Sequence, residues 1–159
     1  MKEVIVSEWE NIPAAEDGTF ILDLRSRDIR DCTGCWCCWQ KTPGRCASHD
    51  LDDFYKAFLH AGKAVFYAGV SCDFVSGKLK TLFDRMIPHF LPYTTYSTGE
   101  SMHETRYDHY PEVEVYYQGE FSSDEARTFY EEYLQRVFYQ FHLPKISIYS
   151  AEEKEVRAV

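Results

Sequence analysis

Residues 64–79 read Ala64-Val65-Phe66-Tyr67-Ala68-Gly69-Val70-Ser71-Cys72-Asp73-Phe74-Val75-Ser76-Gly77-Lys78-Leu79. The first five residues are an uninterrupted apolar run, which is typical of a strand buried on both faces. Ser76 is a residue type that caps helix amino termini, and apolar residues follow it at helical spacing: Leu79, Leu82, Phe83 and Met86. A buried strand, a short loop and a helix form the repeating unit of a parallel α/β sheet.

Further segments extend this pattern along the chain. We expect strands at residues 4–6, 19–24, 113–117 and 145–149, and helices near 50–61 and 122–141. The second of these helices would begin at a capping box made by Ser122 and Glu125. Strands that alternate with helices predict an α/β fold, a flavodoxin-like open parallel sheet of about five strands with helices on both faces. We predict that residues 1–159 form a single domain of this kind.

The connection between the first two strands departs from the pattern. It has about a dozen residues, including Pro13 and Gly18, which barely meets the minimum length for a parallel crossover. We therefore expect the helix of this first crossover to be shortened or missing.

Charge and hydropathy limit the partners of the chain. The net charge is −9, which disfavours nucleic acid and anionic membranes as partners. No apolar run approaches the ~20 residues that span a bilayer, and the charged segment 1–8 lacks the apolar core of a secretory signal. These features predict a cytoplasmic protein whose thiols stay reduced.

Five of the six cysteines lie between Cys32 and Cys46. Four of them follow the pattern C-x2-C-x2-C-x7-C: Cys32, Cys35, Cys38 and Cys46. Thiolates at the first two spacings can converge on one metal, so these four residues are candidate ligands of a [4Fe–4S] cluster or of zinc, with Cys37 to spare. Two alternatives stay open, namely cysteines that only pack a loop and a redox pair among Cys35, Cys37 and Cys38. The second is disfavoured because only Lys41 and Arg45 could lower a thiol pKa nearby.

Two segments carry a family resemblance. The run Cys-x-Gly-Cys-x-x-Cys-Trp-x-Lys-Thr-Pro-Gly-x-Cys at residues 32–46 and the helix Ser76–Arg85 resemble the flavodoxin-fold NAD(P)H-dependent FMN reductases and iron–sulfur flavoproteins. The resemblance implies FMN at the carboxyl ends of the strands, NAD(P)H and an unknown electron acceptor as partners, and a homodimer. It also places the cysteine loop over the flavin ring. The residues that it assigns to the ring are Gly69, Val70, Ser71, Cys72, Asp73, Phe74 and Ser76.

The chain departs from this family at two positions. The family holds the FMN phosphate with a hydroxyl- and glycine-rich loop after the first strand, whereas residues 7–11 (Ser-Glu-Trp-Glu-Asn) offer one hydroxyl and two carboxylates. Gly69 and Ser71 stand where the family carries Pro and Tyr. The segment 94–99, Thr-Thr-Tyr-Ser-Thr-Gly, is a substitute candidate for the phosphate.

The remaining polar residues are predicted to have ordinary roles. We expect an ion pair on the helix surface from Lys80, Asp84 and Arg85, and a solvated loop around His103, Glu104, Arg106 and His109. The predicted function is a flavin-dependent oxidoreductase that passes electrons from a nicotinamide to an acceptor through FMN. The alternatives are a non-enzymatic relative that binds a metal, an iron–sulfur cluster or another protein, and a subunit that completes a flavin site only with a partner chain.

Overall fold

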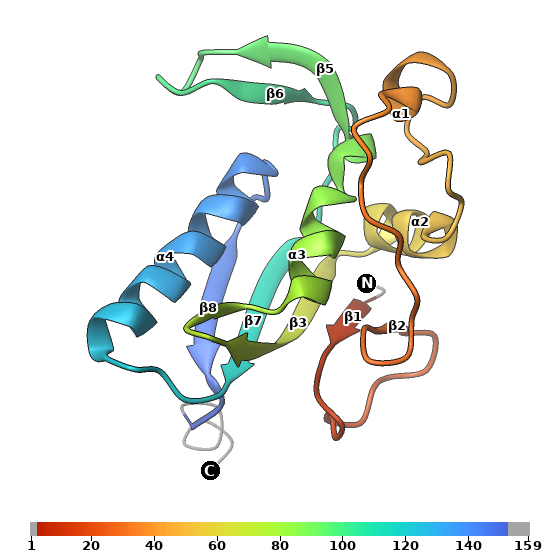
Figure 1. The fold of residues 1–159 in the computed structure, drawn as a ribbon. Helices are drawn as coiled ribbons and strands as arrows, with labels where there is room; N and C mark the ends of the chain where they lie inside the picture. Colours follow the sequence, from red (N-terminus) through yellow and green to blue (C-terminus); the bar gives the residue numbers. More distant parts are fainter. Residues whose placement is uncertain (1–2, 153–159) are drawn as a thin grey trace.

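The main sheet contains five parallel strands. The computed structural model describes residues 3–152, and the strands are β1 (Glu3–Ser7), β2 (Phe20–Asp23), β3 (Lys63–Ser71), β7 (Glu112–Gln118) and β8 (Ile146–Ser150). Their order is β2-β1-β3-β7-β8 (Figure 1), with Ile5 in register with both Ile21 and Val65. A short strand, β4 (Phe74–Val75), folds back antiparallel onto β3. This topology confirms the flavodoxin-like parallel sheet.

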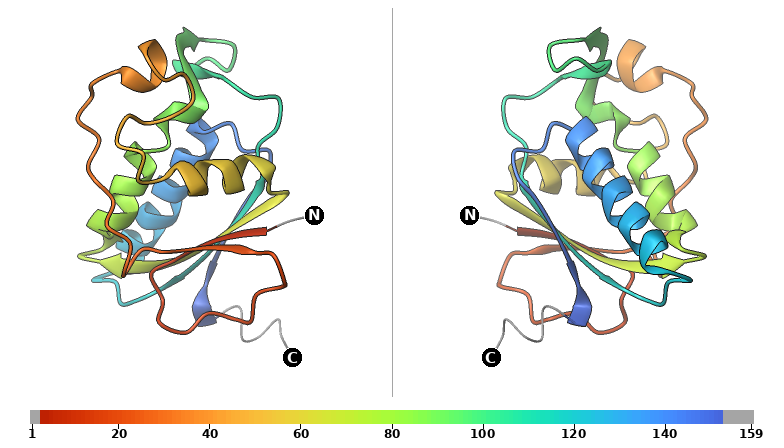
Figure 2. Two further views of the ribbon diagram at one scale, coloured as in Figure 1. Left: turned by 90° about the vertical axis from the view of Figure 1, so that its right-hand side faces the viewer. Right: turned by 90° about the vertical axis from the view of Figure 1, so that its left-hand side faces the viewer.

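The three longer helices lie on one face of the sheet. They are α2 (Asp52–His60), α3 (Gly77–Asp84) and α4 (Asp124–Gln140), and Figure 2 shows all three on the same side. Their apolar residues share one core with alternate strand residues such as Val4 and Phe66. The alternation of strands and helices in the sequence predicted helices on both faces, so this part of the arrangement differs from the prediction.

The missing layer has a physical cause in the first crossover. Residues 8–19 join β1 to β2 without a helix, as the short connection and Pro13 led us to expect. Among the described residues, the second face of the sheet carries a small cluster instead: Ile5, Val65 and Tyr67, packed against Trp9, Ile12 and Tyr116.

Two helix starts can be compared with their predictions. The Ser76 hydroxyl accepts the Leu79 N–H at 3.0 Å, which confirms it as the cap of α3. At α4 the cap is Ser123, which accepts the Ala126 N–H at 3.1 Å, so the predicted capping box at Ser122 was wrong by one residue.

The segment after α3 forms structure that the sequence pattern did not indicate. A 3₁₀ turn, η1 (Ile87–His89), leads into a hairpin of β5 (Phe90–Thr95) and β6 (Met102–Thr105). This hairpin and the short helix α1 (Cys37–Gln40) lie together at one end of the molecule, and the β3–β4 turn lies at the other (Figure 1). Since α3 runs between the two ends, the cysteine loop does not cover residues 69–76, and that prediction was wrong.

Candidate functional site

The end of β1 is the position where the resemblance implies the FMN phosphate. Here the Glu8 carboxylate accepts hydrogen bonds from the Gly69 N–H, at 2.8 Å, and from the Ser76 hydroxyl. The Trp9 indole N–H donates to the Ala68 carbonyl at 2.8 Å. The Gly69 N–H and the Ser76 hydroxyl, which could bind an anion at this edge, are therefore already bound to a carboxylate of the chain itself.

The residues that the resemblance assigns to the flavin ring lie together in the β3–β4 hairpin and at the start of α3: Gly69, Val70, Ser71, Cys72, Asp73, Phe74 and Ser76. The turn of the hairpin is formed by Cys72 and Asp73, both in the left-handed region with φ of 51° and 61°. The Asp73 carboxylate accepts the Ser122 N–H at 2.7 Å and the Ser122 hydroxyl. The Phe74 ring packs on Tyr133 with centroids 4.4 Å apart.

These contacts disfavour an FMN phosphate at the end of β1. The hydroxyl of Ser76 and the N–H of Gly69 are engaged by Glu8, and a second anion placed beside that carboxylate would be repelled. The substitute segment 94–99 begins in the last residues of β5, at the opposite end of the molecule (Figure 1), so it does not join these residues in one site.

The cysteine loop instead borders a cavity of about 360 Å³. All four cysteines of the C-x2-C-x2-C-x7-C series line this cavity: Cys32, Cys35, Cys38 and Cys46. Trp36 and Trp39 also line it and meet edge to face, with ring centroids 5.4 Å apart. The Trp39 indole N–H donates to the Phe90 carbonyl at 2.9 Å, which fixes α1 to the start of β5. We call this space the thiol cavity.

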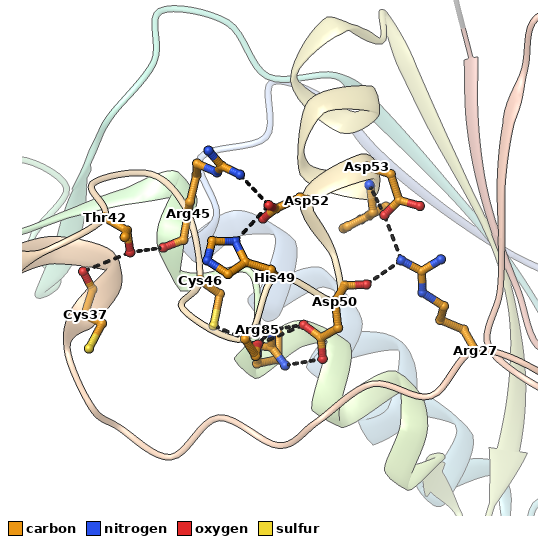
Figure 3. A network of polar contacts seen from close by, with 12 residues as sticks. Arg27, Cys37, Thr42, Arg45, Cys46, His49, Asp50, Asp52, Asp53 and Arg85 are labelled. Carbon is orange, nitrogen blue, oxygen red and sulfur yellow. Dashed lines mark hydrogen bonds and ion pairs between the residues drawn. The ribbon is translucent and has the colours of Figure 1, made fainter.

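An ion pair between Arg85 and Asp50 lies at the wall of the thiol cavity (Figure 3). Arg85, which follows α3 and is 1% exposed, lines the cavity and binds both carboxylate oxygens of Asp50. Its guanidinium also donates to the Ser48 hydroxyl and to the Arg30 carbonyl. Ser48 in turn lies 3.2 Å from the Cys46 sulfur. Arg85 therefore connects the two ends of the cysteine loop to the end of α3.

The network also perturbs ionisation. Burial opposes the charge of Asp50, but hydrogen bonds from Arg85, the Arg30 N–H and Ser48 outweigh it and lower the carboxyl pKa. Burial likewise opposes the charge of Arg85, and Asp50 raises its pKa. The prediction that Arg85 belongs to a surface ion pair was wrong, whereas Lys80 and Asp84 do form one, at 2.6 Å.

The thiols differ among themselves. Hydrogen bonds from the Cys37 N–H, the Cys37 thiol and the Thr33 hydroxyl lower the pKa of Cys35. The bond to Cys35, together with burial, raises the pKa of Cys37. Burial and then the neighbouring thiols raise the pKa of Cys38. Hydrogen bonds, and not a neighbouring cation, therefore lower the pKa of the Cys35 thiol.

The predicted metal ligands share a cavity but are not drawn together. Within residues 3–152, no group of three or more His, Cys, Asp or Glu side chains is arranged to hold a metal ion. We predicted a [4Fe–4S] cluster or zinc on Cys32, Cys35, Cys38 and Cys46. The structure places all four around one cavity but does not bring them close enough together to form a ligand set.

The polar residues of the later loop have structural contacts. His103 packs on Trp39, with centroids 5.1 Å apart. Arg106 donates to the Pro88 and Phe90 carbonyls. His109 lies 3.1 Å from the Ala61 carbonyl. A separate residue that the sequence did not single out is His89, which is fully buried.

Comparison with known proteins gives a result at the level of the fold. The chain matches no protein-family model and no curated protein. Among solved structures it is similar to Smu.1420 from Streptococcus mutans UA159 (TM-score 0.62, 12% identity, 94% of this chain and 86% of that one). It is also similar to an azoreductase from Bacillus anthracis str. Sterne (TM-score 0.62, 13% identity, 94% of this chain and 85% of that one). A third similar structure is the azoreductase AzrA (TM-score 0.61, 13% identity, 99% of this chain and 91% of that one).

No helix within residues 3–152 is long and apolar enough to cross a membrane. At 12–13% identity the similarity to the three structures concerns architecture alone. The chain therefore has the flavodoxin-like α/β fold that these proteins share.

Proposed function

We propose that this chain is a redox protein in which the thiol cavity, and not the ends of the strands, is the working site. In this proposal Cys32, Cys35, Cys38 and Cys46 hold an iron–sulfur cluster. The observation that carries the proposal is that all four cysteines of the series line one cavity, although fourteen positions separate the first from the last.

The chemistry of the lining suits such a group. Four thiolates are the usual ligand set of a [4Fe–4S] cluster, which supplies one-electron transfer when it is bound. The first two cysteines lie within residues 24–36, which contain no helix or strand, and the proposal requires this segment to move inward to complete a ligand set. Charge near the sulfurs tunes the potential of a cluster, and Arg85 places a buried positive charge at the wall.

The other residues of the wall would control access. Trp39 is anchored to the Phe90 carbonyl and presents its ring to the cavity, which limits the entry of water. Trp36 is 57% exposed and lies at the mouth, where an aromatic side chain is suited to contact an electron donor or acceptor.

Anaerobic purification tests this proposal. We expect a brown protein with iron and sulfide bound, and we expect Cys38→Ser to lose the colour. The matched control is Cys72→Ser, because Cys72 is an exposed cysteine in the β3–β4 turn, far from the cavity. A protein that binds no iron under these conditions, or a Cys38→Ser variant that keeps its full iron content, would contradict the proposal.

A second candidate is a flavin-dependent oxidoreductase that passes electrons from NAD(P)H to an acceptor through FMN. The fold that the chain shares with two azoreductase structures favours it, and the position of Glu8 argues against it. Titration of FMN into the protein, followed by flavin fluorescence, separates the two candidates. Saturable quenching with a rise in melting temperature would support the flavin, and unchanged fluorescence and melting temperature would exclude it. A homodimer stays a prediction for either function, and sedimentation equilibrium tests it.

A further inference from the structure

A groove between α3 and α4 has no part in the function proposed above. Its volume is about 600 Å³, which lies within the range of sites that bind small organic molecules. Apolar side chains from the end of α3, from η1, and from the second half and the C-cap of α4 form most of its wall: Phe83, Ile87, Tyr133, Val137 and Phe141. Three of the five are aromatic, so the wall suits a flat ring. We call this space the helix groove.

Two polar side chains of the helix groove converge on one carboxylate. Arg136 and Gln140 lie one turn apart on α4, and both line the groove. The Arg136 guanidinium and the Gln140 amide donate to the same oxygen of Glu100, the amide at 3.2 Å. Glu100 belongs to the loop between β5 and β6 and does not line the groove itself. The structure therefore already holds a carboxylate against two residues of the groove.

The charges at the helix groove favour an anion beside Arg136. Among the described residues that line the groove, Arg136 is the one cation and Asp84 the one anion, and Lys80 pairs with Asp84 at 2.6 Å. The Arg136 guanidinium carbon lies 4.9 Å from the centroid of the Tyr139 ring, and this contact orients the cation. A ligand that fits both the apolar wall and this cation carries a ring and a negative charge.

We propose that the helix groove binds aromatic carboxylates. The ring packs against the apolar wall, and the carboxylate replaces Glu100 between Arg136 and Gln140, where a planar guanidinium can donate two parallel hydrogen bonds. Release of Glu100 costs little, because the Arg136 and Glu100 side chains are 51% and 44% exposed. Cys32 lines both the helix groove and the thiol cavity, but the proposal does not depend on what the thiol cavity holds.

The experiment titrates the full chain with cinnamate and with its neutral isostere cinnamamide, and NMR follows the amide chemical shifts. In the wild type we expect saturable shifts at residues of the groove. Cinnamate should bind roughly fivefold more tightly than cinnamamide, because a half-exposed ion pair contributes about this much. The chain has a net charge of −9, so long-range charge opposes this preference and a local cation is needed to explain it.

Four variants locate the site. Arg136→Met should abolish the preference for cinnamate, and Glu100→Gln should strengthen cinnamate binding because the competing carboxylate is gone. The matched control is Arg127→Met, which removes an exposed arginine near the start of α4 that does not line the groove, and it should keep the wild-type preference. Val137→Glu puts a charge into the apolar wall and should abolish the binding of both probes.

Three results would overturn the proposal: no saturable shifts in the wild type, equal affinity of the wild type for the two probes, or a preference for cinnamate that Arg136→Met retains. If Val137→Glu keeps the wild-type melting temperature and still binds both probes, the site lies outside the helix groove and the proposal is wrong. Neither probe requires iron for its binding, so this proposal and the iron–sulfur proposal can fail independently.

Discussion

Replacement of Arg85 by methionine is the sharpest structural test of how the cysteine loop is held. Arg85 is 1% exposed and forms a bidentate ion pair with Asp50, whose side chain is 15% exposed. Arg85→Met leaves that carboxylate buried without its cation, and breaking a buried pair in this way typically costs 3–5 kcal/mol.

The lower end of that range applies here. Asp50 keeps the Arg30 N–H at 2.9 Å and the Ser48 hydroxyl at 2.8 Å, and its partial exposure allows some hydration. We therefore expect Arg85→Met to lower the free energy of unfolding by about 3 kcal/mol. The double variant Arg85→Met with Asp50→Asn should cost less than the sum of the two single variants, because the orphaned charge is gone.

Urea unfolding under reducing conditions, followed by circular dichroism, measures these differences. The control is Lys80→Met, which removes the ion pair between Lys80 and Asp84 on the exposed side of α3. Because the Lys80 and Asp84 side chains are 44% and 52% exposed, this change should cost no more than about 0.5 kcal/mol. If Arg85→Met costs as little as Lys80→Met, the buried ion pair does not hold the loop.

Three further changes should have defined effects. Burial, and then the charge of Arg106, lower the pKa of His89 to about 3. Between pH 6.5 and that value only the unfolded chain binds the proton, so the free energy of unfolding should fall by about 1.4 kcal/mol for each pH unit by which the pH is lowered. His89→Leu should flatten this pH dependence, measured as the midpoint of urea unfolding. Gly119→Ala places a Cβ 2.7 Å from the Val70 Cβ at a φ of +141° and should lower the unfolding free energy by about 1–3 kcal/mol in the same assay. Ser123→Ala removes the cap of α4 and should lower the melting temperature, at a cost of about 1 kcal/mol.

Much of the fold could be predicted because it depends on local patterns. Each strand of the main sheet corresponds to a predicted apolar segment, such as 64–68 within Lys63–Ser71. The cap at Ser76 was predictable because a hydroxyl before a helical apolar stripe has one common use. The single helical layer was only half predictable: the short first crossover indicated a missing helix, but not that the other helices would all cover the same face.

The candidate site was harder to predict because it depends on contacts between distant residues. Nothing near Arg85 in the sequence indicates that its partner is Asp50, thirty-five residues earlier, and a Lys-Asp-Arg helix surface was the simpler explanation. The sequence places the Glu8 carboxylate where the family has a phosphate loop, but its bonds to Gly69 and Ser76 arise only when β1 and β3 are paired. The left-handed turn at Trp36, between Cys35 and Cys37, is not indicated by any residue preference.

The most direct test of the thiol cavity as the working site is one joint measurement on anaerobically purified wild-type protein. Iron, acid-labile sulfide and flavin are each determined per chain on the same sample. We predict bound iron and sulfide with no flavin, because the cysteines share a cavity and the Glu8 carboxylate engages the Gly69 N–H and the Ser76 hydroxyl at the strand ends. Stoichiometric flavin without iron would contradict this conclusion and return the function to the ends of the strands.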